Sequence, residues 1–341
     1  MSKSMKRWEM DAFGRGRLKL KEAPAPVPGP GEALVKVAAV ALNYRDKLMI
    51  ESGMGLNVAF PFTPASDLAG VVVATGSGAS RFKVGERVIS TYAPGWFDGL
   101  PLGDARNLPY RSLGGVYPGV LSEYVAFPED WFARAPVALD DGEASALPCA
   151  GLTAWFALVE LGRLRAGETV VVQGTGGVAL FGIQIAKAHG AKVIVVSGSA
   201  EKLERAKSIG ADHGVDRSKE DWAEAVLRIT GGRGVDHILE IVGGPNLGKA
   251  VQAAAIGGRI AQIGVLEGFE VAAPSVPLML KHVTIHGVSV GHRRALEDFI
   301  AAVDNVGLKP VIDQRYPLAE LPAALDRLEQ GAFGKVVVEM A

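Results

Sequence analysis

The chain has 341 residues, of which 48% are hydrophobic and 21% are charged, and its net charge is −1. This length exceeds one ordinary core, so we expect two domains, and the near-zero charge without a long Lys/Arg run argues against a nucleic-acid surface. The single cysteine, Cys149, excludes an intrachain disulfide and a multi-cysteine zinc cluster. The start MSKSMKRWEMDAF has no apolar leader, and no apolar run is long enough to span a bilayer. We therefore expect a cytoplasmic protein.

The first part of the chain predicts a β-rich domain. It follows a proline-punctuated connector at 24–32, and a hairpin-like pair is expected around Gly85. Apolar runs that predict strands lie at 33–40, 65–78, 82–90 and 121–125. Short strands at close spacing with glycine turns are typical of a compact β-rich domain rather than of βαβ units. The irregular segment 92–119, rich in Gly and Pro, predicts a long surface lobe or lid.

A change of pattern marks the domain boundary. Two helical pieces are expected at 143–161, broken near Pro148 and Gly151, and an alternation of strands and helices follows. The tail is helix and then strand, and a final VVV strand needs a sheet to join. We therefore place the first domain at 1–150 and 293–341 and the second at 151–292.

The stretch TVVVQGTGGVALFG at 169–182 organises the second domain. A continuous apolar run is typical of a parallel strand buried on both faces, and glycines follow where that strand should turn into a helix. Gly174 suits the tight turn, Gly176 lets the main chain approach a pyrophosphate, and Ala179 lets the helix pack close to the sheet. The helix N-terminus would face the phosphates. Alone, this spacing is a weak signal in a chain with 43 glycines.

The sequence after this turn strengthens the prediction. An amphipathic helix is expected at 201–211, and further apolar strands are expected at 191–196, 235–241, 259–263 and 283–288. Strands that alternate with helices predict an α/β fold with a doubly wound parallel sheet. In such a fold, a glycine-rich turn between the first strand and helix is typical of a dinucleotide-binding site. The last strand would present an unpaired edge, and we therefore expect a homo-oligomer, a dimer or a tetramer.

These motifs together resemble one family. The β-rich domain, the CAGLTAW segment at 149–155, the glycine turn and the closing GKVVV resemble the medium-chain dehydrogenase/reductase superfamily over nearly the whole chain. LNYRDKLM at 42–49 and the missing cysteines resemble its zinc-independent quinone and enoyl reductase branch. The resemblance implies a GroES-like catalytic domain, a Rossmann domain and NAD(P)-dependent oxidoreductase activity.

The resemblance also bears on zinc. Zinc-dependent members have Cys, His and Cys where this chain has Asn43, Ser66 and Cys149. An amide, a hydroxyl and one thiol do not make a zinc ligand set, and the lobe at 92–119, which corresponds to the structural zinc lobe, has no cysteine. We therefore expect no zinc. Cys149 is interpreted as a small packing residue, with a catalytic thiol as the alternative.

Site residues are carried over position by position. Asn43 and Tyr44 are candidate catalytic donors that stabilise negative charge on the substrate oxygen, and Asn43 also helps to seat the nicotinamide ribose. Thr153 matches a position that contacts the nicotinamide, and Lys335 matches a basic residue that reaches the pyrophosphate. The plain alternatives are a helix N-cap for Asn43, packing for Tyr44 and a solvated surface position for Lys335.

Cofactor choice depends on the end of the second strand. NAD enzymes usually place Asp or Glu there, whereas this chain has Ser197 and Ser199. Small hydroxyls leave room for a 2′-phosphate, with Lys202 or Arg205 supplying charge unless Arg205 simply faces solvent. NADP(H) is thus favoured, and the nearby Glu201 keeps NAD(H) open. The remaining expected cofactor contacts are Thr175, Gly177, Val178, Val242, Ile263 and Gly264.

Three functions remain open. The leading one is an NADPH-dependent reductase of quinones or α,β-unsaturated carbonyl compounds; the second is an alcohol dehydrogenase or ketone reductase; the third is a nucleotide-binding protein with little turnover and a structural or regulatory role. We expect a small-molecule substrate and no membrane partner. Asp46 and Asp67 match acidic positions of the family and either hold loops or move protons. Among the scattered histidines, His292 is the one to test.

Overall fold

The computed structural model describes residues 4–108 and 110–340. The chain divides into two compact units, one built from the chain's two ends, up to Leu152 and from Val290 onward, and the other from Thr153 to Ser289. No helix in the described ranges combines the length and the apolar character that crossing a bilayer requires.

One sheet dominates the first unit. Its order is β14-β15-β3-β4-β5-β7, with β6 paired to β3. The bounds are β3 (Glu32–Leu42), β4 (Asp67–Thr75), β5 (Arg87–Ser90), β6 (Tyr124–Pro128), β7 (Phe132–Arg134), β14 (Ile312–Pro317) and β15 (Lys335–Glu339). Every pairing is antiparallel except that of β14 with β15. A separate two-stranded ribbon joins β1 (Ser4–Glu9) to β2 (Lys19–Pro24). The expected β-rich character of this unit is confirmed.

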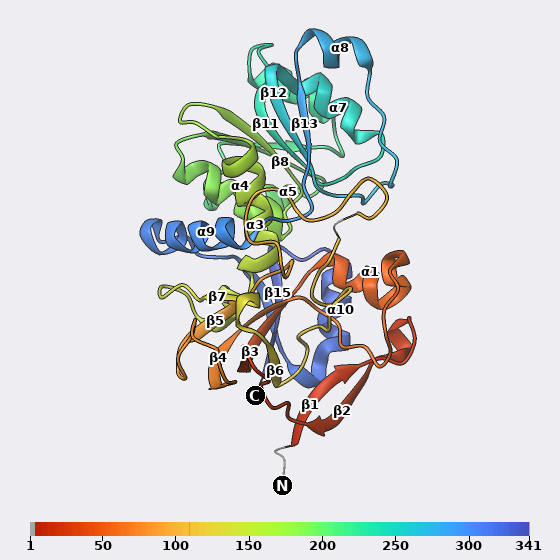
Figure 1. Ribbon diagram of the computed structural model, residues 1–341. Helices are drawn as coiled ribbons and strands as arrows, with labels where there is room; N and C mark the ends of the chain where they lie inside the picture. Colours follow the sequence, from red (N-terminus) through yellow and green to blue (C-terminus); the bar gives the residue numbers. More distant parts are fainter. Residues whose placement is uncertain (1–3, 109, 341) are drawn as a thin grey trace. The chain divides into compact units, whose positions relative to one another are not determined.

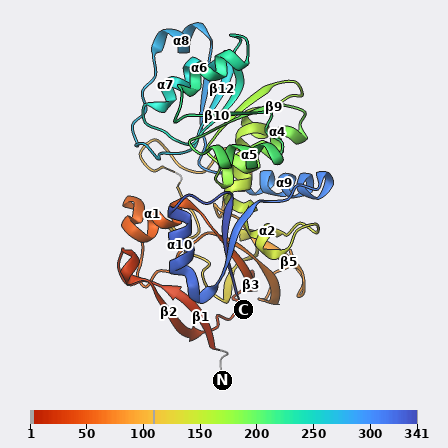
Figure 2. The same cartoon turned by 180° about the vertical axis from the view of Figure 1, so that it is seen from behind.

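The last strand lies inside this sheet. β15 pairs antiparallel with β3, so that Val336 faces Leu42 and Val338 faces Val40, and these valines are fully buried. A run of buried β-branched residues is what a central strand requires. Figure 2 shows α10 (Leu321–Glu329) and α1 (Tyr44–Ser52), which also contact each other, beside this sheet.

Two local expectations for this unit are corrected. The run at 82–90 is not a hairpin-like pair, because only β5 is extended; Gly85 has φ +94° and its N–H donates to Val72 O, which makes the preceding residues a turn onto β4. The interruption expected within 143–161 lies at Ala146 rather than near Pro148 and Gly151. Helix α2 (Asp141–Ser145) is followed by π-helical turns at 147–151 and 156–161 on either side of α3 (Leu152–Trp155). Pro148 begins a turn, where a missing N–H costs nothing.

The second unit contains the predicted doubly wound sheet, and this fold class is confirmed. Its strands are all parallel, in the order β10-β9-β8-β11-β12-β13. Their bounds are β8 (Thr169–Gln173), β9 (Lys192–Ser197), β10 (His213–Asp216), β11 (Val235–Glu240), β12 (Ala254–Gln262) and β13 (Thr284–Gly287). The order reverses at β8, which pairs with β9 on one side and β11 on the other.

Helices cover both faces of this sheet. Figure 1 shows α4 (Gly177–Ala188) and α5 (Ala200–Ser208) on one side, and α7 (Asn246–Ala253) on the other, where α6 (Trp222–Ile229) contacts it. Neighbouring side chains of β8 point to opposite faces of the sheet. Val171 packs with α6 and α7, whereas Val172 faces Gly182 of α4. A buried parallel strand requires this apolar character on both sides.

Candidate active site

The turn from β8 into α4 has the geometry of a phosphate-binding turn. Gly174 has φ +75°, a conformation that only glycine adopts without strain, and its N–H donates to Val196 O at 2.7 Å. Gly176 is the N-cap of α4, and a Cβ added there would meet no atom within 4 Å. Thr175 is buried, and Gly177 and Val178 form the first turn of the helix. The open space over a helix N-terminus fits a diphosphate.

The other predicted cofactor contacts of the second unit meet at one edge of its sheet. Ser197 ends β9, and Ser199 is the N-cap of α5, where its Oγ accepts the N–H of Lys202 at 3.3 Å. Val242 follows β11, and Ile263 and Gly264 follow β12. The carboxyl ends of parallel strands share one edge, which is where open α/β sheets bind ligands.

Glu240, which sequence reasoning missed, organises the loops on this edge. It is fully buried at the end of β11, and its carboxylate accepts hydrogen bonds from the N–H groups of Val242 and Gly243 at 2.8 and 2.9 Å. Its main-chain oxygen accepts the N–H of Ile263 at 2.8 Å. One buried carboxylate thus fixes two loops that carry predicted contacts. A buried acid at a strand end was the available sequence signal.

Two orphaned acceptors lie near this point. Gln173 Nε2 donates to Glu240 at 3.0 Å, which leaves Gln173 Oε1 buried without a partner in the described residues. Gln262 Oε1, at the end of β12, is also without one. Buried polar atoms are rarely left unpaired, so these oxygens favour a donor-bearing ligand or water at this edge.

Arg217 was also missed. It directly follows β10, its N–H donates to Ser197 O at 3.0 Å, and a Cβ on Gly198 would lie 3.8 Å from its Nε. Arg217 is exposed, and its side chain therefore flanks the serines at the end of β9. Its distance in sequence from the glycine turn did not point to it, because only the pairing of β10 with β9 places Arg217 beside the end of β9.

In the first unit, the residues that replace metal ligands lie together. Asn43 Nδ2 is 3.5 Å from Ser66 Oγ, and Ser66 Oγ donates to Asp67 Oδ1 at 2.5 Å. The other Asp67 oxygen accepts the N–H of Cys149 at 3.0 Å. Burial raises the pKa of Asp67 to about 6 and raises the pKa of the Cys149 thiol well above its usual range.

Lys335 joins this cluster. It is 3% exposed, and its Nζ donates to Asn43 Oδ1 at 2.5 Å. The alternative of a solvated surface lysine is therefore wrong. Asn43 is also the N-cap of α1 and forms a capping box with Asp46, whose carboxylate accepts the Asn43 main-chain N–H at 2.8 Å, so its side chain serves both the helix end and Lys335.

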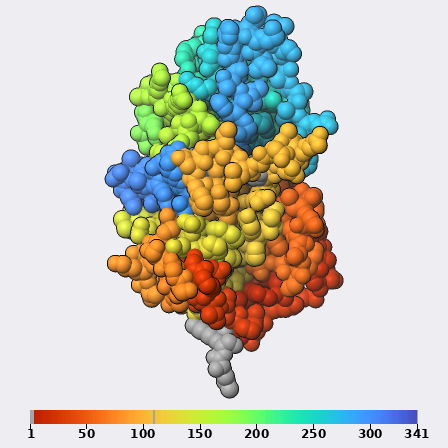
Figure 3. Space-filling view, viewed as in Figure 1, coloured from red at the N-terminus to blue at the C-terminus, as the bar shows by residue number. Residues whose placement is uncertain are grey.

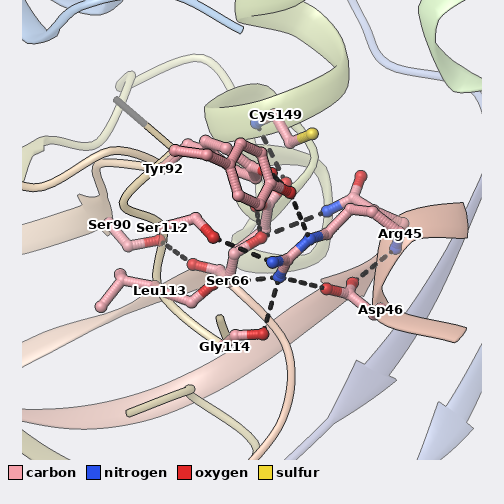
Figure 4. Close-up of polar contacts among 12 residues, drawn as sticks. Arg45, Asp46, Ser66, Ser90, Tyr92, Ser112, Leu113, Gly114 and Cys149 are labelled. Atoms are coloured by element: carbon pink, nitrogen blue, oxygen red, sulfur yellow. Dashed lines mark hydrogen bonds and ion pairs between the residues drawn. The ribbon is translucent and has the colours of Figure 1, made fainter. Parts of the chain in front are cut away.

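Arg45 ties α1 to the lobe at 92–119 (Figure 4). Its guanidinium donates to Asp46, to the carbonyls of Leu113 and Gly114, and to the Ser112 hydroxyl, at 2.8 to 3.1 Å. The ring of Tyr92 lies 5.5 Å away, centroid to Cζ, and its hydroxyl is 2.8 Å from that of Tyr110. The inner part of the lobe is thus anchored.

The outer part of the lobe is exposed, as expected of a surface segment. Leu100 and Leu102 are 90% and 84% exposed. The N–H groups of Arg293 and Arg294 in α9 (Arg293–Val306) donate to Trp96 O and Phe97 O, and Figure 3 shows the lobe on the surface beside α9.

The remaining candidates are dispersed. Tyr44 begins α1 and is 45% exposed, with Lys47 Nζ 5.8 Å from its ring centroid. Thr153 is buried in α3. Arg205 is exposed on α5. His292 is the N-cap of α9, and its Nδ1 accepts the N–H of Ala295 at 3.0 Å, which requires an unprotonated Nδ1.

Two family profiles match the chain. Residues 29–137 match the alcohol dehydrogenase GroES-like domain, and residues 177–306 match the zinc-binding dehydrogenase profile. Together with the strand orders described above, these matches place the chain among the medium-chain dehydrogenases/reductases, and it is an NAD(P)-dependent oxidoreductase of that family.

Individual relatives agree with this assignment. The zinc-type alcohol dehydrogenase-like protein C1773.06c of Schizosaccharomyces pombe is 34% identical over 317 residues, which cover 91% of each chain. The quinone oxidoreductase of Homo sapiens is 28% identical over 316 residues, 90% of this chain and 88% of that one. A crystal structure of a candidate alcohol dehydrogenase from Sinorhizobium meliloti 1021 is 61% identical, covers 99% of both chains and superposes with a TM-score of 0.97.

The residues present do not fit the zinc ion of the family's metal-dependent members. Asn43 and Ser66 offer an amide and a hydroxyl, and the one thiol of Cys149 does not complete the three-ligand set that a catalytic zinc requires. In the described residues, no group of three or more His, Cys, Asp and Glu side chains is arranged to hold a metal. The glycine turn and its strand-end neighbours, in contrast, fit a nicotinamide dinucleotide.

Proposed function

We propose that this protein reduces quinones or α,β-unsaturated carbonyl compounds with NADPH and without a metal ion. The observation that carries the proposal is the buried cluster of Asn43, Ser66, Asp67 and Lys335, in which Asn43 and Ser66 offer an amide and a hydroxyl at two positions that the resemblance gives to metal ligands. The relatives named quinone oxidoreductase support the same substrate class.

The chemistry needs an electrophilic partner for oxygen. Bound NADPH would supply a hydride to the alkene carbon β to the carbonyl, which would leave the electron pair of the double bond as negative charge on the carbonyl oxygen. Protonation of the α-carbon from water completes the reduction. Asn43 Nδ2–H is the proposed donor to that oxygen, and a fixed donor of this kind is worth about 10²- to 10³-fold in rate. Tyr44 and Thr153 remain proposed site residues.

The choice of NADPH has its own support. Ser197 and Ser199 leave the end of β9 without a carboxylate, and Arg217 flanks Gly198. A carboxylate would repel a 2′-phosphate, whereas a guanidinium binds it with two donors. Lys202, at the start of α5, adds to the positive charge.

A second candidate is alcohol oxidation or ketone reduction, because the Sinorhizobium meliloti structure is described as that of a candidate alcohol dehydrogenase. A third is nucleotide binding with little turnover. The test follows NADPH and NADH oxidation against enones, quinones, aldehydes and ketones, with and without chelator. We expect enone or quinone reduction with NADPH that chelator leaves unchanged. Ketone activity lost with chelator would support the second candidate, and tight NADPH binding without turnover would support the third.

We also propose that a second copy of this chain covers the β13 edge. β13 pairs only with β12 among the described strands, and exposed apolar side chains gather on β12, β13 and α8 (Ser275–Leu280), namely Ile256, Val276, Met279, Leu280 and Ile285. Unpaired edges with apolar side chains favour strand addition. Light scattering of the purified protein should give at least twice the 35.7 kDa chain mass, and Ile285→Lys should reduce it to one chain.

A further inference from the structure

Lys335 and Asn43 form a buried pair that the resemblance does not explain. Resemblance assigns Lys335 to the pyrophosphate, yet Nζ is 2.5 Å from Asn43 Oδ1 and the residue is 3% exposed. Lys335 is the first residue of β15, and Asn43 directly follows β3, so the antiparallel pairing of these two strands brings them together.

This contact fixes the amide in one orientation. An ammonium group has three donors and no acceptor, so only the carbonyl oxygen of Asn43 can face it. The amide nitrogen must then face the other way, toward Ser66. The Ser66 hydroxyl donates its hydrogen to Asp67 Oδ1 at 2.5 Å, and toward the Asn43 amide it can therefore act only as an acceptor.

The amide nitrogen of Asn43 has two N–H groups; the side chain hydrogen-bonds the Asp67 carboxyl group, and its contact with Ser66 is long. The distance from the amide nitrogen to Ser66 Oγ is 3.5 Å, at the outer limit of a hydrogen bond. Such a contact is readily exchanged for a stronger one to a negatively charged oxygen, because charged acceptors form shorter and stronger hydrogen bonds. The carboxyl groups of Asp46 and Asp67 interact electrostatically with the buried ammonium group of Lys335 and offset its positive charge.

We propose that Lys335 is a positioning residue that holds the Asn43 amide with its N–H groups presented to the substrate oxygen. The inference rests on the proposed function, in which Asn43 is that donor. Lys335 then affects the chemical step through Asn43, and its ammonium does not serve the pyrophosphate.

The test uses the full chain and the variants Lys335→Met, Lys335→Arg, Asn43→Ala and the double variant Lys335→Met/Asn43→Ala. Lys36→Met, an exposed lysine on β3, is the matched control. Lys335→Met should lower kcat by about 10²-fold, the cost of one lost oxyanion donor. Its NADPH Kd, measured by fluorescence, should rise by less than about tenfold, because at most the one ribose hydrogen bond expected of Asn43 is weakened. Lys335→Arg should restore part of kcat, since a guanidinium also donates to Oδ1.

The double variant separates positioning from a general structural role. If Lys335 acts through Asn43, the two losses in kcat are not additive, and the double variant is about as slow as Asn43→Ala alone. Thermal unfolding of the ligand-free variants should show the same coupling, which does not depend on activity. Additive effects, or a large rise in NADPH Kd with kcat unchanged, would overturn the inference. A wild-type enzyme that reduces no enone or quinone would instead refute the proposed function, while the unfolding coupling still reports on the pair.

Discussion

The carboxylate of Asp67 accepts the main-chain N–H of Cys149 at 3.0 Å, so an acidic group lies beside the single thiol. Burial, reinforced by this negative charge, raises the pKa of the thiol. A thiolate is the reactive form, and each unit of raised pKa lowers its fraction about tenfold.

Cys149 should therefore react slowly at neutral pH. We expect iodoacetamide to modify the folded protein at pH 7.5 at least about tenfold more slowly than the urea-unfolded chain. Asp67→Asn should increase the folded rate, because it removes the neighbouring charge. Fast modification of the native protein, read by intact mass, would support the catalytic-thiol alternative.

Asp67 should make stability depend on pH. Its folded pKa of about 6 exceeds the ordinary value of 3.8, so the folded state holds a proton that the unfolded state loses between these values. The contribution of this group is present below pH 4 and falls as pH rises to 6, by about 3 kcal/mol in total. The unfolding free energy of Asp67→Asn relative to wild type should rise by about 1 kcal/mol from pH 5 to 7.5. An unchanged difference in urea titrations at the two pH values would contradict this.

The glycine turn offers a matched pair of variants. Gly174→Ala places a side chain at φ +75°, which costs about 1–2 kcal/mol and should lower Tm. Gly176→Ala has φ −81° and free space, so we expect a stability loss below about 1 kcal/mol. Its methyl group would fill the approach of the diphosphate, so its NADPH Kd should rise at least about tenfold. Unchanged NADPH affinity in Gly176→Ala would show that the diphosphate does not bind at this turn.

Arg45 should be a structural rather than a chemical residue. Arg45→Met leaves Asp46 and two carbonyls without their buried donor, which should cost about 3–5 kcal/mol. We expect faster proteolysis within 92–119, because the lobe loses its anchor. Arg111→Met, an exposed neighbour in the same lobe, is the control and should change neither measurement. Equal effects of the two variants would argue against the anchor.

Arg217 should discriminate between the cofactors. Arg217→Ala should raise KM for NADPH by about 10- to 100-fold, the value of one or two charged hydrogen bonds, and leave KM for NADH within about 2-fold. Lys219→Ala, two residues away and paired with Asp216, is the matched control. A similar loss with both cofactors would show that Arg217 supports the fold of the strand end instead.

The sequence was sufficient for those features that depend on local pattern. The apolar run at 169–173 and the glycines that follow it predict a parallel strand and its turn. Burial on both faces requires apolar residues at consecutive positions, and a positive φ favours glycine, so both features can be recognised from residue types alone. The resemblance likewise implies that Asn43 and Ser66 stand where zinc-dependent members have metal ligands, while Cys149 keeps the third.

Features that depend on strand pairing were not accessible in this way. Lys335 is buried because β15 lies between β14 and β3, and Arg217 approaches Gly198 because β10 pairs with β9. Both contacts join residues whose separation in sequence has no fixed period. The π-helical turns at 147–151 were missed because a proline and a glycine predict a break when their position in a turn is unknown.

The pairing of β15 with β3 also determines the order in which the protein can mature. A ribosome delivers every strand of the nucleotide sheet before it delivers β15, so the nascent chain can complete that sheet while part of β3 still waits for its neighbour. A polypeptide that ends before Lys335 would lack the ammonium beside Asn43 and would leave part of β3 as an unpaired strand edge.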